Sequence, residues 1–529
     1  MSNVKNITRV YLLNVPLEND YKNTLFFDNK TAQETYFKSR IVARFSDFSY
    51  LRKDGVIKVP SKDDNFLATE FDNLLNLGVN YVMYQNTAYS NKWFYAFIKD
   101  VRYGSDSYTE IEIETDVIQT WYFDYRIKES FVEREHVTDD TPGLHIQPEN
   151  LETGEYISVG NESVNLGEFY IVVGTTHDGY VNTAGGIYGG CYSGVKYLYF
   201  NRKSYNLVND YLEEMATKGK SDAITCVFLA PSFLVADEDT DGKIEGVIDG
   251  SFKARTMIIP MNKNIPGNGG IIGSYVPHNN KLFTFPFNYL MLSNNNGATA
   301  IYKYEDFHNP DDPEKCTFRI DGTICPGCST KITPLFYKGM NENLDESING
   351  GKYPICNWNT DVYTNWLTQN SLNISLSTAA GVASVVTGVA TFNAEAVSSG
   401  LFGIANTMAQ KYQQSLTPPQ AEGNTNCGDV LTAMGNNTFS IHQMTIKEQT
   451  AILIDKFFDM FGYQVNHVKV PNYNHRDGYW YTKTQNINID GAIPMNDMEK
   501  IKKCYNDGIT FWRDPGTIQD YSISNDIIV

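Results

Sequence analysis

Alternation between acidic and apolar residues is the pattern that most constrains how this chain can fold. Between Tyr108 and Tyr122, four carboxylates alternate with four residues that suit a sheet interior: Glu110, Glu112, Glu114 and Asp116 against Ile111, Ile113, Thr115 and Val117. Successive strand side chains point to opposite faces, so this period of two predicts a strand with all four carboxylates on one face. That face is either a solvated outer surface or the lining of a passage for something anionic.

Short aromatic-rich segments separated by turns predict strands along most of the chain. Tyr81–Gln85 and Lys92–Lys99 are two of them, and aromatic residues, which favour strands, make up 13% of the 529 residues. The dipeptides that mark turns are Asn296-Gly297, Asp241-Gly242 and Asp321-Gly322. Short helices are expected at about Tyr205–Lys218 and at Thr445–Phe461, the second because its apolar residues follow helical spacing. The final stretch, Tyr463–Val529, is expected to hold strands and turns. We therefore predict a mainly β, β-rich α+β protein of about three or four domains.

Charge and composition exclude several classes of protein. Hydrophobic residues are 42% of the chain, enough apolar surface to exclude wholesale disorder. The formal net charge is −19 without a long basic run, which argues against a protein that grips nucleic acid, although an acidic wall would let DNA slide past. The first twenty residues show no secretory signal, and eight Cys fit a reducing cytosol.

One long segment carries no charge at all. Val362–Ala394 is uncharged for 33 residues, Glu395 interrupts it, and Ala396–Gln410 continues it before Pro418-Pro419. Its apolar centre, Ala379–Phe392, is shorter than the roughly 20 residues of a membrane span. Small residues recur there every four positions, which favours close helix packing. The segment is either a buried small-residue helix or core loop, or a sheltered segment that enters a membrane when several copies associate.

Two groups of residues are candidates for metal binding. Asp237, Asp239 and Asp241 precede Gly242 as at the start of a calcium loop, but the twelfth position is Ile248 instead of a glutamate. They form either an acidic turn or a calcium site of another geometry. The second group joins Cys325 and Cys328 to two more distant thiols, Cys316 and Cys356, and leaves zinc, a disulfide or redox pair, and free thiols open.

No arrangement of residues marks a catalytic centre, so we predict that the protein is not an enzyme. The eight His are scattered, and none belongs to an HExxH motif. Gly219-Lys220-Ser221 ends like a phosphate-binding loop, but Glu214 stands in place of its leading glycine. Ser193 lies in GCYSG and not in GxSxG. A glycosidase pair of carboxylates would leave no sequence mark here.

Three blocks of the sequence together resemble the distal tube, or tail knob, proteins of small short-tailed phages of Gram-positive bacteria. They are Asn19–Phe27, Tyr84–Val137, and a block from Phe461–Asn472 to Asn506–Asp514. The resemblance implies a hexameric ring at the distal end of the tail. It also implies that residues 1–137 and 445–529 form a tail-tube β-barrel domain, that 138–360 form an inserted β-rich knob of one or two domains, and that 361–444 form a long hydrophobic loop.

The same resemblance implies a function for the loop and a set of partners. The loop would plug the tube and then be released to penetrate the host cytoplasmic membrane. Its membrane-active residues would be Ala379, Ala380, Gly381, Ala383, Ser384, Val385, Val386, Gly388, Val389, Phe392, Leu401, Phe402 and Ile404. The partners would be the other copies of this chain, the upstream tail tube or collar protein, that membrane, and phage DNA that passes without specific binding. The protein would be made in the host cytoplasm.

Two further expectations attach to this family. Glu110–Asp116 becomes a candidate lumen wall, since negative walls repel phosphates. Glu395 inside the hydrophobic segment becomes a candidate pH switch, because a charged carboxylate opposes insertion. Two alternatives remain open: a tail tip that binds or degrades the cell wall, in which aromatic residues stack on glycan, and a purely structural tube whose uncharged segment is core. No cofactor is required by any of the three, apart from the calcium considered above.

Overall fold

The computed structural model describes most of the chain, and its described residues divide into two compact units. The described ranges are 8–48, 53–60, 74, 76–86, 90–164, 166, 169–176, 186–188, 191–193, 195–201, 205–218, 223–235, 245–247, 256–322, 324, 329–352, 355–357, 423–424 and 439–528. Unit 1 comprises 1–152, 277–281 and 452–529, and unit 2 comprises 153–276 and 282–451. Strands dominate both units, which confirms the predicted mainly β fold.

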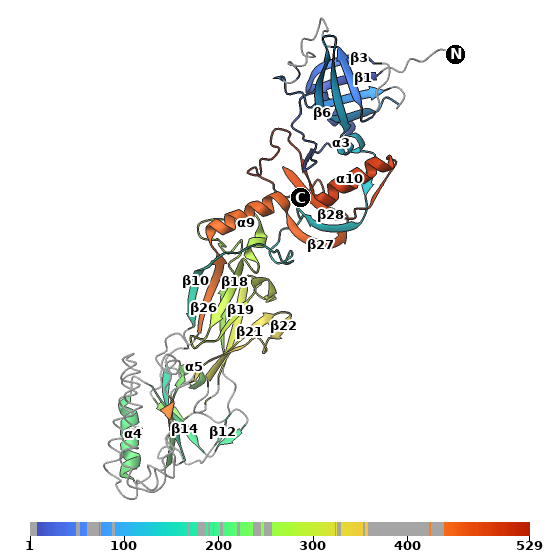
Figure 1. The fold of residues 1–529 in the computed structure, drawn as a ribbon. Helices are drawn as coiled ribbons and strands as arrows, with labels where there is room; N and C mark the ends of the chain where they lie inside the picture. Colours follow the sequence, from blue (N-terminus) through green and yellow to red (C-terminus); the bar gives the residue numbers. More distant parts are fainter. Residues whose placement is uncertain are drawn as a thin grey trace, which may run out of the picture. The chain divides into compact units, whose positions relative to one another are not determined.

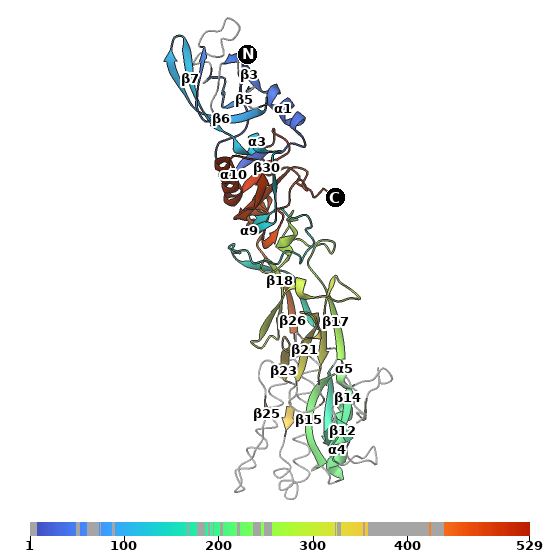
Figure 2. The ribbon, with the colours of Figure 1, turned by 90° about the vertical axis from the view of Figure 1, so that its right-hand side faces the viewer.

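The first sheet of unit 1 is an antiparallel sheet of six strands in the order β3-β1-β5-β6-β7-β4. The strands are β1 Thr8–Leu13, β3 Ile41–Phe48, β4 Val56–Pro60, β5 Tyr81–Asn86, β6 Trp93–Ser105 and β7 Tyr108–Thr115. Figure 2 shows β6 and β7 as a long hairpin, and β4 pairs with β7 at the edge of the sheet. The strands expected at Tyr81–Gln85, at Lys92–Lys99 and after Tyr108 are thereby confirmed.

The second sheet of unit 1 combines N-terminal and C-terminal strands in the order β2-β30-β28-β9-β27, with β2 and β30 parallel. Its strands are β2 Asn23–Leu25, β9 Ser130–Glu135, β27 Tyr463–Lys469, β28 Tyr479–Gln485 and β30 Ile509–Trp512. β8 (Tyr125–Ile127) pairs separately with β29 (Ile489–Gly491). The helices of the unit are α1 Lys30–Ser39, α3 Val117–Trp121 and α10 Met495–Asp507, together with the end of α9 (Glu448–Phe461).

Aromatic side chains join the two sheets of unit 1 into one core. Phe37 of α1 stacks on Tyr81 of the first sheet, with centroids 5.4 Å apart and planes at 8°. The same cluster contains Tyr479 and Trp512 of the second sheet, whose rings lie 4.5 Å apart. Buried aromatic residues contribute large apolar areas and favourable ring contacts. The two ends of the chain are therefore parts of one folded unit.

Unit 2 contains three main sheets over one continuous core. The sheets have the orders β10-β26-β18-β19, β17-β20-β21-β22 with β23 beside β21, and β16-β14-β11-β15-β24-β25, besides the hairpin β12-β13. Their bounds are β10 Tyr156–Val164, β11 Phe169–Thr175, β12 Gly186–Tyr188, β13 Cys191–Ser193, β14 Lys196–Asn201, β15 Ile224–Pro231, β16 Glu245–Val247, β17 Thr256–Asn262, β18 Asn288–Ser293, β19 Thr299–Tyr302, β20 Lys315–Asp321, β21 Ser329–Tyr337, β22 Met340–Glu342, β23 Ile348–Lys352, β24 Ile355–Asn357, β25 Gly423–Asn424 and β26 Phe439–Ile446.

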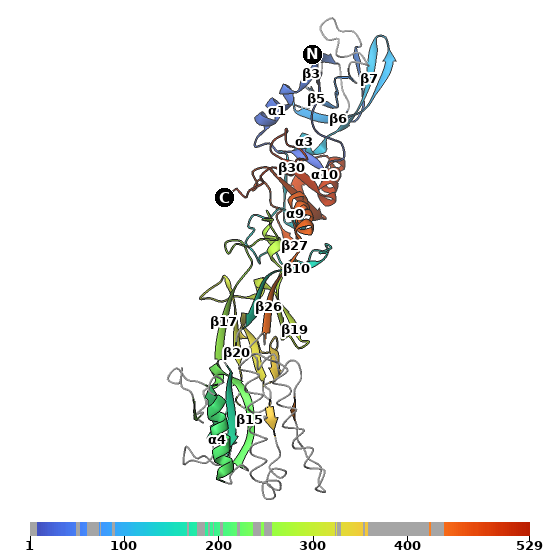
Figure 3. The ribbon, with the colours of Figure 1, turned by 90° about the vertical axis from the view of Figure 1, so that its left-hand side faces the viewer.

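Short helices complete unit 2. They are α4 Tyr205–Thr217, α5 Ser232–Val235 and the 3-10 turns η6 Asn280–Phe283, which begins in unit 1, and η7 Tyr304–Asp306. α4 lies along the sheet that contains β14 and β15 (Figure 3). It confirms the helix expected at Tyr205–Lys218. The Asn296-Gly297 turn is also confirmed, because it connects β18 to β19 with Gly297 at φ 92°.

Two predicted boundaries and the predicted content of one region are wrong. The helix expected from Thr445 begins at Glu448, because Thr445 and Ile446 complete β26 and pair with β10 and β18. Residues 439–444, assigned to the hydrophobic loop, belong to that same strand. The region after Tyr463, expected to hold only strands and turns, contains α10, whose residues Asp497, Ile501, Cys504 and Tyr505 are buried along one side.

Candidate functional site

The carboxylates of β7 lie where their spacing predicted. Glu110, Glu112 and Glu114 are half-buried, and the intervening Ile111 and Ile113 are buried in the core of the first sheet. The prediction that these three acidic residues share one face of a strand is confirmed. Whether that face lines a lumen stays a prediction.

Asp116 does not share that face, so its place in the acidic row is a wrong prediction. β7 ends at Thr115, and Asp116 caps α3 by accepting a hydrogen bond from the backbone N–H of Gln119 at 3.0 Å. The Tyr81 hydroxyl donates a second bond to its carboxylate at 2.7 Å. Asp116 is 1% exposed, and burial raises its pKa to about 6. Its role is therefore structural, because it starts a helix inside the unit.

Each remaining carboxylate of the row contacts a basic side chain from a neighbouring element. The pairs are Lys58–Glu110 at 3.1 Å, Arg102–Glu112 at 2.9 Å, Lys99–Glu114 at 3.4 Å and Lys500–Glu114 at 3.0 Å. The hydrogen bond from Lys500 holds the pKa of Glu114 below its usual value. These pairs are exposed, so each contributes little stability. Their consequence is electrostatic. Together with its basic partners, the row of carboxylates is close to neutral and not strongly negative.

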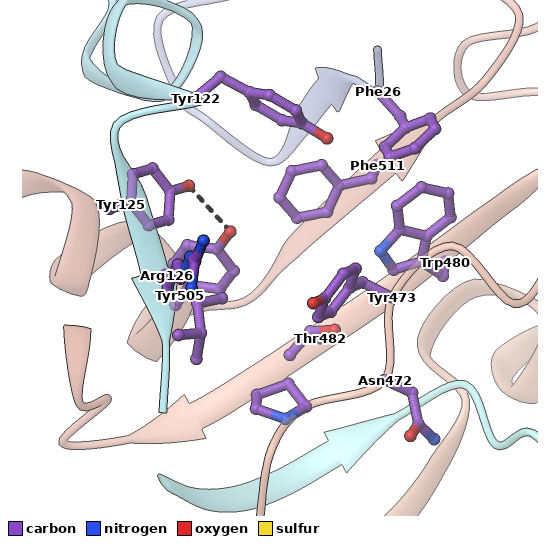
Figure 4. A pocket seen from close by; sticks show the side chains of 12 residues that line it. Phe26, Tyr122, Tyr125, Arg126, Asn472, Tyr473, Trp480, Thr482, Tyr505 and Phe511 are labelled. Atoms are coloured by element: carbon purple, nitrogen blue, oxygen red, sulfur yellow. Dashed lines mark hydrogen bonds between the residues drawn. The ribbon is translucent and has the colours of Figure 1, made fainter. Parts of the chain in front are cut away.

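An aromatic pocket of about 310 Å³ lies in unit 1, beside the second sheet (Figure 4). Its lining comes from distant parts of the chain: Phe26, Tyr122, Tyr125, Arg126, Ile127, Pro471, Asn472, Tyr473, Trp480, Thr482, Tyr505 and Phe511. Strand pairing explains the convergence, since β28 and β30 place Trp480 opposite Phe511. Sequence reasoning missed this pocket.

Polar groups are few in the pocket. The hydroxyls of Tyr125 and Tyr505 lie 3.0 Å apart, and burial raises the pKa of both phenols. Asn472 is already engaged, because its side chain donates to the His136 carbonyl at 3.3 Å and accepts from Lys469 at 2.9 Å. None of the described residues that line the pocket carries a carboxylate. It therefore offers no acid–base pair and suits binding.

The buried charges of unit 1 are structural. Glu149 forms ion pairs with Arg134 and, at 2.6 Å, with Lys281, and accepts the backbone N–H of Gln464 at 2.8 Å. The three partners come from β9, from 277–281 and from β27, so one carboxylate joins three segments. A buried carboxylate needs such partners to remain charged.

Metal candidates gain no support among the described residues. Asp237, Asp239 and Asp241 lie outside them, as do Cys325 and Cys328. The thiol of Cys316 is free and buried in β20, and burial raises its pKa. Within the described ranges, no three His, Cys, Asp or Glu residues come together as a metal site would require. Calcium binding stays a prediction.

The predicted membrane-active residues, from Ala379 to Ile404, and the predicted pH switch Glu395 also lie outside the described residues. Among the helices that the structure does describe, none combines the length and the apolar character needed to cross a bilayer.

Two family models match the chain. The C-terminal domain of the tail knob protein gp9 of Bacillus phage phi29 matches residues 252–526, more than half of the chain. The N-terminus of the caudoviral major tail protein matches residues 5–128. The two matches include parts of both units and leave residues 129–251 unmatched.

Whole-length comparisons agree with the family models. The tail knob proteins gp9 of Bacillus phages PZA and phi29 are 26% and 24% identical to this chain, and each match covers 98% of both sequences. The solved tail knob protein gp12 of bacteriophage C1 shares the fold, with a TM-score of 0.67 over 98% of this chain and 100% of that one at 14% identity. The chain therefore belongs to the tail knob protein gp9 family and is a structural protein of a phage tail, not an enzyme.

Proposed function

We propose that six copies of this chain form a ring at the distal end of the tail, conduct the phage DNA, and release a hydrophobic loop into the host cytoplasmic membrane. The observation that carries the membrane role is the uncharged Val362–Ala394 segment. Several copies around one axis would compensate for a centre too short and too polar to span alone.

The family resemblance and the chemistry of sheet edges support the proposed ring. A sheet edge exposes unpaired backbone groups, and closure of a ring covers such edges between copies. The neighbours would be other copies of this chain and the upstream tube or collar protein. The proposed lumen would bear no free cationic stripe along β7, because every glutamate there already neutralises a basic side chain. The phosphates of passing DNA would therefore meet few unpaired cations, and little DNA would be held through release of its counterions.

Deletion of residues 377–409 tests the membrane role. We expect the shortened chain to assemble as the full chain does, and to lose the ability to release dye from anionic liposomes. The reason is that the deletion removes the apolar centre while leaving every described residue of both units in place. Dye release is followed by fluorescence, and assembly by mass photometry of the same sample.

Two single substitutions provide a matched control for that deletion. Val385→Asp places a charge in the apolar centre, where an aspartate costs about 3 kcal/mol on insertion. Gln413→Asp adds the same charge beyond the uncharged run. Leakage should fall at least fivefold for the first and stay unchanged for the second. Full leakage from the deletion variant would place the membrane activity elsewhere in the chain.

A further inference from the structure

The aromatic pocket of unit 1 is unexplained by either the conduit or the membrane role. The floor of the pocket consists of buried rings, those of Trp480, Phe511 and Tyr505. Tyr473 lies at the rim and is 56% exposed. The rings therefore form a preformed, accessible cavity. Its volume of about 310 Å³ lies at the small end of the range for ligand sites, enough for one ring-sized group.

The rings are inclined to one another, which argues against a planar ligand. Trp480 and Phe511, which are paired across two strands, are stacked with their ring centroids 5.6 Å apart and their planes at 10°. Phe26 meets Trp480 at 71°, and Tyr122 meets Phe511 at 59°. A nucleobase is held by stacking on flat faces. Aromatic faces that are inclined to one another instead suit a puckered ring, whose C–H groups point in several directions.

The polar groups of the pocket also suit a hydroxylated ring. Tyrosine hydroxyls both donate and accept, as a polyhydroxylated ligand requires, and the Tyr125–Tyr505 pair supplies two adjacent ones. Arg126 stands at the lining, and among the described residues no ion pair or hydrogen bond occupies its guanidinium. A second guanidinium, that of Arg513, lies over the rings of Phe26 and Trp480.

The charge balance points to an anionic substituent. The described lining residues include one guanidinium, that of Arg126, and no carboxylate, so a cationic ligand is disfavoured and an anion is favoured. The hydrogen bond from Lys128, 2.9 Å away, is the main cause that lowers the pKa of the Asp490 carboxylate, and the charge of Arg126 adds a smaller contribution. Guanidinium is the side-chain group that best matches a carboxylate or phosphate, through two parallel hydrogen bonds.

We propose that this pocket binds a saccharide ring that carries an anionic group. The C–H face of the sugar packs on Trp480 and Phe511, its hydroxyls contact the tyrosines, and its carboxylate or phosphate pairs with Arg126. This binding function is independent of the proposed membrane and DNA roles, so failure of either would leave it standing.

Three probes test the proposal on the full-length chain by saturation-transfer NMR and calorimetry. Methyl glucoside, methyl glucuronide and glucose 6-phosphate share one ring and differ in their charged group, and adenosine monophosphate serves as a planar anion. At least one anionic sugar should bind about tenfold more tightly than the neutral one, because charge-assisted hydrogen bonds exceed neutral ones by about that factor. The stronger of the two distinguishes carboxylate from phosphate recognition.

Substitutions at the rim connect that binding to the pocket. Arg126→Ala should remove the tenfold preference for the anionic sugar, and Tyr473→Ala should weaken all sugars severalfold. Tyr103→Ala is the matched control, because Tyr103 is similarly exposed at 60% in unit 1 but lies outside the pocket. All three side chains are exposed, so the variants should fold as the parent does.

Several results would overturn the proposal. They are absence of binding by all three sugars, tighter binding of adenosine monophosphate, or a preference that survives Arg126→Ala. Binding by the isolated chain that disappears in the assembled ring would assign the pocket to a subunit contact and equally overturn it.

Discussion

At the scale of single residues, Asp116 shows how burial converts one carboxylate into a pH-dependent element of stability. The fold raises its pKa to about 6 against the ordinary value of about 4. The protonated form is therefore favoured in the folded state. Its stabilising contribution is fully present below about pH 4 and is lost as the pH rises through about 6, at a cost on the order of 3 kcal/mol.

Asp116→Asn should remove this dependence, because the amide keeps both the cap to Gln119 and a contact with Tyr81 but cannot ionise. Relative to the parent, the melting temperature of the variant should rise as the pH increases from 4 to 7. Asp116→Ala should show the same pH trend but melt lower than Asp116→Asn at every pH, since it also cannot ionise but loses a helix cap at a cost of about 1 kcal/mol. Thermal melts over this pH range make both comparisons.

Asp345→Asn controls for a change in net charge, because Asp345 is exposed. A melting difference between Asp116→Asn and the parent that stays constant with pH would contradict the raised pKa. Sequence alone could not separate Asp116 from the glutamates before it. The period of two continues through residue 116, and only the turn into α3 buries the last carboxylate.

At the scale of elements, β7 is a strand whose acidic face is neutralised by its neighbours. The alternation predicted the strand and the shared face of Glu110, Glu112 and Glu114 correctly. It could not predict Lys58, Lys99 and Arg102, which come from β4 and β6 through antiparallel register. We therefore no longer expect a strongly negative wall along β7, but a wall on which each glutamate is paired with a basic side chain.

Glu110→Gln combined with Glu112→Gln should make the protein retain DNA. The double substitution removes the ion-pair partner of Lys58 and leaves Arg102 paired only with Asp100 at 2.6 Å, and both basic side chains are more than half exposed. Freed cations bind phosphates and release counterions, so retention should be strongest at low salt and fall steeply as salt rises. Filter binding of double-stranded DNA across a salt series measures this.

The control for this pair of changes is Glu152→Gln with Glu162→Gln, which alters net charge equally at exposed positions of other segments. Equal DNA retention by the two double variants would show that the pairs on β7 do not mask cationic groups.

Helix α10 and the aromatic pocket show two different limits of sequence reasoning. The helix left a signal, because Asp497, Ile501, Cys504 and Tyr505 follow helical spacing after Pro494, and the strand-rich surroundings obscured it. The pocket left no such signal in the sequence. Trp480 and Phe511 become neighbours only through the pairing of β28 with β30.

At the scale of the whole molecule, chain ends and chain middle have separate structural roles. The three blocks that carry the family resemblance all contribute to unit 1, where Phe37, Tyr81, Tyr479 and Trp512 share one core. Unit 2 is formed mainly by the middle of the chain. The predicted ranges for the tail-tube domain, the knob and the loop remain predictions about function, although their boundaries must move to fit β26 and 277–281.

Family membership establishes a structural tail protein, and the central claim beyond it is the ring. Negative-stain imaging of the purified full-length chain, with mass photometry of the same sample, tests that claim most directly. The account predicts particles of six copies with sixfold symmetry and a central channel. Particles that remain monomeric, both alone and when mixed with isolated phage tails that lack this protein, would contradict it.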